Sequence, residues 1–234
     1  MFFSLIEPVL GAEREAAFSR LHGPYAEHQW LWQFFPAPEG TPRDFLFRRM
    51  EGEGGSRFYV VSARRPETGS EAWSVRTRDY SPQVEVGQRL RFDLRVNPVV
   101  TIKRDGKARR DDVVMHEKKR LLQERGLKRW ADWQGHDKPA EYDLVTSACR
   151  DWLCAPRRTE PSRAEKAGFR LIDESLGVDA YQQHEASRKG VRFSTADLSG
   201  ELEVIDIEAF AATLQGGLGH GKAFGCGLLL VQKV

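Results

Sequence analysis

The sequence predicts an α+β protein made of two tandem ferredoxin-like (RRM-like, βαββαβ) domains. Three observations support this fold class. The chain has 234 residues, which is enough for one large or two small domains. Strand, helix and strand-pair patterns occur twice in the same order, without a tandem sequence repeat. A helical segment followed by an apolar strand ends the second series, as a βαββαβ domain requires.

The first series is expected to form a domain over residues 1–83. Pro24 suits the first position of a helix, and glycines at 52, 54 and 55 suit a turn between two strands. The expected elements are a strand at 2–9, a helical region at 12–35 interrupted at Gly23-Pro24, and strands at 45–49 and 56–63.

A linker flanked by Pro82 and Gly87 separates this series from the second domain, expected over residues 88–234. Apolar residues alternate along its first strand, and a helical pattern precedes its last one. The expected elements are a strand at 88–96, a basic loop, helices near 116–130 and 140–154, strands near 168–186 and 190–205, a helix from Glu208, and a strand at 228–232.

A run of glycines lies between the last expected helix and the last expected strand. Residues 217–227 read GLGHGKAFGCG, a run that contains five glycines and one lysine, Lys222. Because glycine lacks Cβ and allows positive φ, such a loop can present backbone amides to an anion while the lysine adds a mobile charge. Phosphate is the expected ligand. The alternative is a helix C-cap followed by a bulged strand.

Two familiar phosphate-binding loops do not match this run. Gly216 to Lys222 follows G-x-x-x-x-G-K, but Ala223 replaces the Ser or Thr that binds magnesium, and no strand leads into the loop. The dinucleotide pattern G-x-G-x-x-G fails because the glycine spacing differs and a strand follows. Neither ATP nor NAD is favoured, and no cofactor is expected.

Four segments, in the same order along the chain, match one known family. Residues 24–32 read PYAEHQWLW and are followed by RDFLF at 43–47. Residues 90–98 read LRFDLRVNP, and the glycine run has the form G-h-G, five residues, G-h-G, with h apolar. Together these segments resemble the CasE branch of the CRISPR repeat-RNA endoribonucleases. His220 departs from that pattern, since relatives often have proline there.

The resemblance implies two ferredoxin-like domains and an enzyme that cleaves CRISPR precursor RNA at repeat stem-loops. It also implies that the enzyme keeps the mature crRNA and stays with other subunits of the type I-E effector complex, Cascade. We expect metal-independent cleavage in which a ribose 2′-hydroxyl attacks its own phosphate and leaves 2′,3′-cyclic phosphate and 5′-hydroxyl ends.

Tyr25 and His28 are the expected catalytic residues. They lie three apart, and therefore on one helix face if Pro24 begins a helix. Histidine changes charge near neutral pH, so His28 suits a general acid or base, and Tyr25 suits positioning of the phosphate or a share in the proton transfer. Taken alone, a histidine beside Trp30 and Trp32 is more typical of packing, and it is the CasE resemblance that favours catalysis.

The expected RNA-binding residues come from two places. The first is the glycine run, where Lys222 would offset phosphate charge or would serve a structural role. The second is a basic hairpin near residues 187–192, which would contact the stem or would be an ordinary charged turn. The residues are Gly217, Gly219, Gly221, Lys222, Gly225, Gly227, Arg188, Lys189 and Arg192.

Charge is unevenly distributed along the chain. The net charge is +2, but residues 103–129 hold eleven Lys or Arg against five Asp or Glu. The remainder has 25 basic (36 − 11) and 29 acidic (34 − 5) residues. This segment would either bind RNA phosphates or form an ordinary solvated helix.

Three cysteines lack the spacing of a metal site, so no metal is expected and a reducing cytoplasm is favoured. The apolar N-terminal stretch ends at Glu7 and is too short for a signal sequence or a membrane span.

Two other functions remain open at this stage. A noncatalytic RNA hairpin-binding module would use the same sheets, glycine run and basic segments if His28 faced the core, because a fold does not fix an activity. A nucleotide-using enzyme would require magnesium-dependent ATP binding at the glycine run, and Ala223 argues against it.

Overall fold

The computed structural model describes residues 1–19, 24–52, 55–104, 106–156, 159–172, 174–186 and 191–234. Packing divides the chain into two compact units. One unit comprises Met1–Val84 with Ala211–Leu229, and the other comprises Glu85–Phe210 with Leu230–Val234. The domain limits 1–83 and 88–234 stay predictions. The glycine run belongs to the same compact unit as the N-terminal residues.

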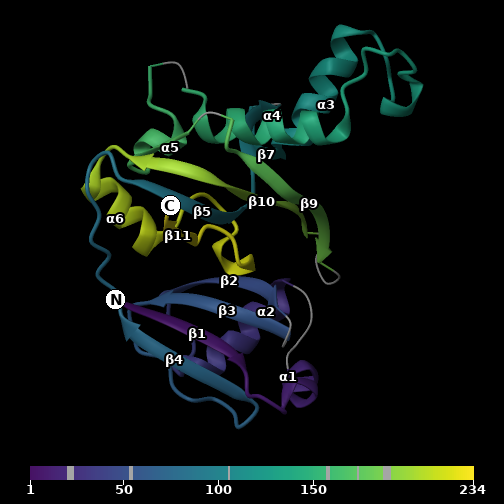
Figure 1. The fold of residues 1–234 in the computed structure, drawn as a ribbon. Coiled ribbons are helices and arrows are strands. Elements are labelled where there is room, and N and C mark those ends of the chain that lie inside the picture. Colours follow the sequence, from purple (N-terminus) through teal and green to yellow (C-terminus); the bar gives the residue numbers. More distant parts are fainter. Residues whose placement is uncertain (20–23, 53–54, 105, 157–158, 173, 187–190) are drawn as a thin grey trace. The chain divides into compact units, whose positions relative to one another are not determined.

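The first unit contains a four-stranded antiparallel sheet of order β2-β3-β1-β4 (Figure 1). This order is that of a ferredoxin-like sheet, in which the first and third strands are central. Its strands are β1 (Phe2–Pro8), β2 (Phe45–Gly52), β3 (Gly55–Ser62) and β4 (Trp73–Asp79). Between β3 and β4, where every residue is described, the chain forms no helix, so this unit has one helical crossover instead of two.

The helical crossover from β1 to β2 carries the predicted catalytic segment. It consists of α1 (Glu13–Ser19), α2 (Pro24–Leu31) and the 3₁₀ turn η1 (Trp32–Phe34). As predicted, α2 begins at Pro24, whose missing N–H has no intrahelical partner at that position in any case.

Trp30 on α2 joins the crossover to the core of the first sheet. Its ring centroid lies 5.1 Å from that of Phe34, 5.0 Å from Phe58 and 4.6 Å from Trp73. Burial of such large rings dominates the stability of a core of this size. On the same helix Glu27 and Leu31 are also buried, His28 is half-buried and Gln29 is exposed.

Strand β4 is absent from the sequence prediction, although its sequence contains a signal. Trp73, Val75 and Thr77 alternate with Ser74, Arg76 and Arg78, which is the period of a strand. In the structure β4 pairs along its whole length with β1. The charged residues within this short segment obscured an alternation that would otherwise have predicted a strand.

The second unit contains a five-stranded sheet in which β11-β5-β10-β8 form the main path and β9 also pairs with β10. The 14-residue β10 is long enough to pair with β9 along its first part and with β8 along its last three residues. The strands are β5 (Arg89–Val96), β8 (Phe169–Leu171), β9 (Gly177–Ala186), β10 (Val191–Val204) and β11 (Leu229–Lys233). The predicted ferredoxin-like order is therefore present in both units.

The LRFDLRVNP segment builds the centre of this second sheet. Leu90, Phe92 and Leu94 are buried on one face of β5. On the other face, Arg95 donates two hydrogen bonds, of 2.6 and 2.7 Å, to the carboxylate of Asp197 on β10. The buried Asn97 amide donates to the Ser194 carbonyl at 2.7 Å. The contacts of these residues thus give the segment a structural role in the second sheet.

A long insertion connects β5 to β8 in the second unit. Where a basic loop was predicted, the structure has a two-stranded hairpin, because the β-branched residues at 99–102 and the turn glycine Gly106, with φ of 72°, favour one. Both predicted helices are present, and Asp112 caps the first by accepting a hydrogen bond from the Met115 amide. The elements are β6 (Val99–Arg104), β7 (Lys107–Asp112), α3 (Val113–Glu124), η2 (Trp130–Asp132), α4 (Glu141–Cys154) and α5 (Arg163–Lys166).

The C-terminal elements follow the predicted order of helix, glycine run and strand. The helix α6 covers Ile207–Gly216, and the run contains a short 3₁₀ turn, η3 (Lys222–Phe224). In the described part of the chain, no helix combines the length and the apolar character needed to cross a membrane.

Candidate functional site

His28 lies on α2 at the edge of the aromatic core of the first unit. Its ring is half-buried, with centroids 6.2 Å from the Trp32 ring and 5.9 Å from the Phe45 ring. Its Nε2 atom is buried and has no hydrogen-bond partner among the described atoms. A buried polar nitrogen without a partner is costly, and such a group at a functional site is often one that awaits a ligand.

The surroundings of His28 favour its neutral form. Burial lowers the pKa of His28 below its ordinary value of 6.5, and the positive charge of Arg43 lowers that pKa further. Both effects disfavour the imidazolium ion. In the free protein at neutral pH, His28 is therefore ready to accept a proton.

Tyr25 belongs to α2 and lies one helical turn before His28. Three-residue spacing places both residues on the same face of the helix. The side chain of Tyr25 lies outside the described residues, so its role stays a prediction.

An ion pair next to His28 anchors α2 to the sheet. Glu27 is 5 % exposed, and its carboxylate accepts a hydrogen bond of 2.5 Å from Nη1 of Arg49 on β2. Arg49 also pairs with Glu51. This pair joins α2 to β2 at the residue next to His28.

The glycine run folds back on itself and packs against β2. The Gly217 amide donates to the Thr213 carbonyl at 2.8 Å, and the Leu218 amide donates to the Gly227 carbonyl at 2.9 Å. The run's five glycines, at 217, 219, 221, 225 and 227, have φ values between 72° and 92°. A Cβ atom at Gly217 would lie 2.8 Å from Leu46, and one at Gly225 would lie 3.0 Å from Phe47.

These contacts explain several glycines without a ligand. Gly225 and Gly227 are buried, and a Cβ atom at Gly227 would lie 2.7 Å from the Leu218 carbonyl oxygen. Gly219 is exposed, and Gly221 is half-buried. Gly217 is half-buried as well, so Gly219 is the most exposed of the predicted RNA-binding glycines.

Lys222 comes from the same run, which contacts both α2 and β2 through η3. Its Nζ donates a hydrogen bond of 2.6 Å to the Gly216 carbonyl oxygen. Burial lowers the pKa of Lys222, and the positive charge of Arg43 lowers it further. The structure therefore brings His28 and Lys222, which are far apart in the sequence, into the electrostatic reach of one arginine.

Arg43 was not predicted as a site residue. It precedes β2 in the RDFLF segment, and its guanidinium acts on both His28 and Lys222. The sequence offered a signal only through family resemblance, because nothing in the local pattern shows that residues 28, 43 and 222 meet.

The basic hairpin β9–β10 belongs to the second unit. Arg188 and Lys189 lie outside the described residues, so their RNA contacts stay predictions. Arg192 is exposed, and its Nε lies 2.9 Å from Oε1 of Glu185 on β9. Since exposed ion pairs contribute little to stability, Arg192 can exchange this carboxylate for a phosphate at low cost.

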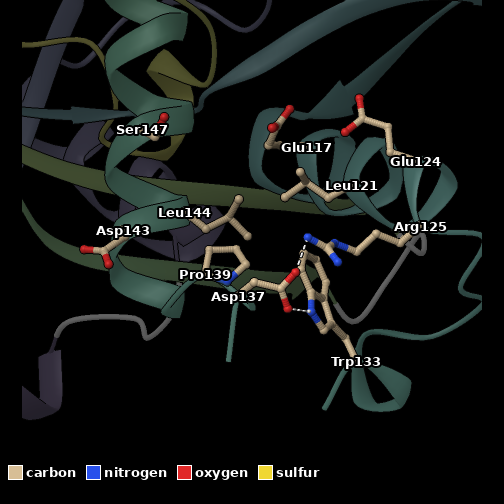
Figure 2. A pocket seen from close by; sticks show the side chains of 10 residues that line it. All are labelled: Glu117, Leu121, Glu124, Arg125, Trp133, Asp137, Pro139, Asp143, Leu144 and Ser147. Carbon is tan, nitrogen blue, oxygen red and sulfur yellow. Dashed lines mark hydrogen bonds and ion pairs between the residues drawn. The ribbon is translucent and has the colours of Figure 1, made fainter. Parts of the chain in front are cut away.

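A pocket lies between α3 and α4 in the second unit (Figure 2). Asp137 is held between Arg125, with which it forms an ion pair, and the indole N–H of Trp133 at 3.1 Å. Three further carboxylates, those of Glu117, Glu124 and Asp143, line the pocket. Arg120 pairs with two of them, Glu117 and Glu124, and the pocket contains none of the predicted site residues.

The described residues contain no group of three His, Cys, Asp or Glu side chains that could hold a metal ion. Cys149 and Cys226 are buried and Cys154 is half-buried, and none of the three forms a disulfide.

The fold and the site define a protein with two ferredoxin-like units and a histidine-containing basic cluster beside a glycine-rich C-terminal loop. A comparison with family models identifies this class. The chain belongs to the family of CRISPR associated proteins, whose model matches residues 1–233.

Individual relatives support the assignment. The chain is 28% identical over 208 residues to the CRISPR system Cascade subunit CasE of Escherichia coli (strain K12), covering 88% of this chain and 89% of that protein. It is 29% identical over 249 aligned positions to the CRISPR-associated endoribonuclease Cse3 of Thermus thermophilus, covering 97% and 98%. A structure of Thermus thermophilus Cse3 bound to an RNA representing a pre-cleavage complex matches with a TM-score of 0.62 and 23% identity, covering 99% and 98%. That last likeness concerns the fold.

Proposed function

We propose that this chain is an endoribonuclease that cleaves CRISPR precursor RNA at repeat stem-loops and keeps the product as a subunit of a type I-E effector complex. Family membership over residues 1–233 supports this, as do relatives named as a Cascade subunit and as an endoribonuclease. The observation that carries the catalytic part is His28, whose buried Nε2 has no partner among the described atoms and whose surroundings keep it neutral beside two basic side chains.

The reaction uses a nucleophile from the substrate. The ribose 2′-oxygen forms a bond to the adjacent phosphorus while the bond from phosphorus to the 5′-oxygen breaks, which gives a 2′,3′-cyclic phosphate and a 5′-hydroxyl. His28 accepts the proton of the 2′-hydroxyl as general base, a contribution of about 10² to 10⁴ in rate. The leaving 5′-oxygen takes a proton from water or from Tyr25. The scheme requires no metal ion.

The RNA-binding residues act at two places. Lys222 and the amides of Gly219 and Gly221 contact the phosphate backbone near His28, while the buried glycines at 225 and 227 fix the shape of the loop. Arg188, Lys189 and Arg192 contact the stem, because double-stranded RNA is recognised mainly through its backbone and shape.

The test uses the full chain in EDTA with the repeat hairpin RNA of its source genome. We expect cleavage of the all-ribose strand, no cleavage of a strand with 2′-deoxyribose at the cut site, and cyclic phosphate at the product end. His28→Ala should reduce single-turnover cleavage by about 10² to 10⁴ while hairpin affinity changes less than about threefold. Tight binding without cleavage by the wild-type chain would contradict the catalytic assignment.

A noncatalytic RNA hairpin-binding module is the second candidate, and one observation favours it. The His28 ring packs against Trp32 and Phe45, as a structural core histidine would. In that case His28→Ala lowers stability and leaves any cleavage rate unchanged. Comparing the rate and the melting temperature of the same variant separates the two candidates.

A further inference from the structure

Arg43 is half-buried in the first unit, at the start of β2, and one of its two terminal nitrogens lacks a partner among the described residues. The Nη1 atom is buried without a hydrogen bond to any described atom. Guanidinium remains charged in proteins and has five donors to satisfy. A buried, charged donor without an acceptor is a costly arrangement unless it is completed by a ligand.

Nearby carboxylates do not supply that acceptor. The adjacent Asp44 accepts two hydrogen bonds from Arg64, at 2.5 and 3.1 Å. Glu27, which precedes His28 on α2, is engaged by Arg49. These two acids therefore bind other arginines, and neither accepts a hydrogen bond from the Nη1 atom of Arg43.

The groups on which Arg43 acts are themselves basic. Its charge disfavours protonation of both His28 on α2 and Lys222 on η3. Two cations and an imidazole held together disfavour any further positive charge, and an anion among them would turn this repulsion into attraction. The packing of Gly217 on Leu46 and of Gly225 on Phe47 holds η3 in place, so the cluster is fixed by the fold.

We propose that Arg43 binds the scissile phosphate of the RNA, with its buried Nη1 donating to a non-bridging oxygen between His28 and Lys222. This inference rests on the proposed function and adds a residue to its site. In the transition state the non-bridging oxygens gain negative charge, and a fixed guanidinium placed there stabilises it. Phosphate binding would also raise the proton affinity of His28 at the moment when it must accept a proton.

The first test is single-turnover cleavage of the repeat hairpin by Arg43→Gln. We expect a loss of about 100-fold, since removal of one oxyanion donor has that effect in other enzymes. Arg43→Lys keeps the positive charge but lacks the planar guanidinium that can donate two parallel hydrogen bonds, so it should recover part of the rate. The control is Arg65→Gln, which removes an arginine that lies at the surface of the same unit and should leave the rate unchanged. Melting temperatures of all three variants show whether each is folded.

The second test separates phosphate contact from a structural role. A hairpin with 2′-deoxyribose at the cut site blocks cleavage, and a methylphosphonate at the same linkage removes the phosphate charge. For the wild type we expect this replacement to weaken binding by about tenfold or more, and for Arg43→Gln by less than about threefold. Equal weakening in both proteins, or a wild-type cleavage rate in Arg43→Gln, would overturn the inference.

The outcomes also distinguish this inference from the proposed function. If the wild type binds the hairpin without cutting it, the catalytic proposal fails, and the inference fails with it because there is no scissile phosphate for Arg43 to bind. If the wild type cuts the hairpin and Arg43→Gln cuts it equally well, only the inference fails. A wild-type protein that neither binds nor cuts the RNA overturns both.

Discussion

His28 combines two properties at the residue scale that a general base needs. It is half-buried against aromatic rings, which keeps its pKa low, and its Nε2 is not committed to another described group of the protein. The ion pair between Glu27 and Arg49 fixes the helix on which it sits. A base with a lowered pKa is a weaker base, but it is present in the required neutral form at physiological pH.

The pH dependence follows from the direction of this shift. Because the pKa of free His28 lies below 6.5, we expect kcat/KM for hairpin cleavage to reach half of its plateau value below pH 6.5 and to fall on further acidification. Arg43→Gln removes one cause of the lowered pKa, so the His28 pKa should rise in that variant yet stay below 6.5, since burial is the larger cause. NMR titration of the His28 ring measures both values, and a wild-type pKa above 6.5 would contradict this account.

The proposed roles of Tyr25, His28 and Lys222 could be inferred from the sequence by resemblance, whereas the sequence assigned no role to Arg43. Tyr25 and His28 lie in one short motif, and Lys222 lies in a glycine pattern that stands out by composition. Arg43 lies in the RDFLF segment of that resemblance, but its proposed role arises from the meeting of three segments that only tertiary packing brings together. The free Nη1 atom is visible in coordinates alone.

At the scale of elements, the glycine loop is a packed structure as much as a binding loop. Its backbone approaches Leu46, Phe47 and its own Leu218 carbonyl too closely for side chains. The glycine pattern predicted that the backbone closely approaches another group, and in the structure several of those groups are side chains and backbone of the protein itself. The loop holds Lys222 beside α2, the N-terminal helix that carries His28.

Gly227→Ala tests this structural role. With φ of 92° and a carbonyl oxygen 2.7 Å from the new Cβ, we expect it to lower the free energy of unfolding by roughly 2 to 4 kcal/mol. Gly216→Ala is the matched control, since a Cβ there meets nothing within 4 Å, and its effect should be below about 1 kcal/mol. Urea unfolding measures both. Equal effects would show that the loop is loosely packed.

The elements themselves were largely predictable because their periodicities are strong. Strand β5 alternates buried and outward residues along its whole length, and α2 has a proline at its first position. The missed elements include the short helix α5, β4 and the β6–β7 hairpin, and the last two are rich in charged residues. Charge obscured their β-branched positions, and pairing with a neighbouring strand overrode the weak local preference.

At the scale of the whole chain, the basic segment 103–129 contains two kinds of cation, those paired with acids and those without such a partner among the described residues. Along and after α3, cations pair with nearby acids. These pairs are Lys118–Glu141, Lys119–Asp111, Arg120–Glu117, Arg120–Glu124, Arg125–Asp137 and Arg129–Asp132. On the β6–β7 hairpin, exposed Lys103, Lys107, Arg109 and Arg110 form no ion pair with any carboxylate that the structure describes.

The predicted solvated helix is thus favoured for α3, and phosphate contact is favoured for the hairpin. Paired cations are already neutralised, so they release few counterions on binding RNA, whereas unpaired cations contribute fully to the salt dependence. The net charge of +2 conceals this division, because it sums over both kinds.

Salt dependence of hairpin affinity measures this difference. Lys107→Gln/Arg110→Gln should reduce the slope of log K against log salt by about 1.4 to 1.8, since each lost phosphate contact is worth about 0.7 to 0.9. Arg14→Gln/Arg65→Gln changes the net charge equally at two arginines of the first unit, and its slope should stay near that of the wild type. If both double variants lowered the slope equally, net charge and not the position of the hairpin cations would govern binding.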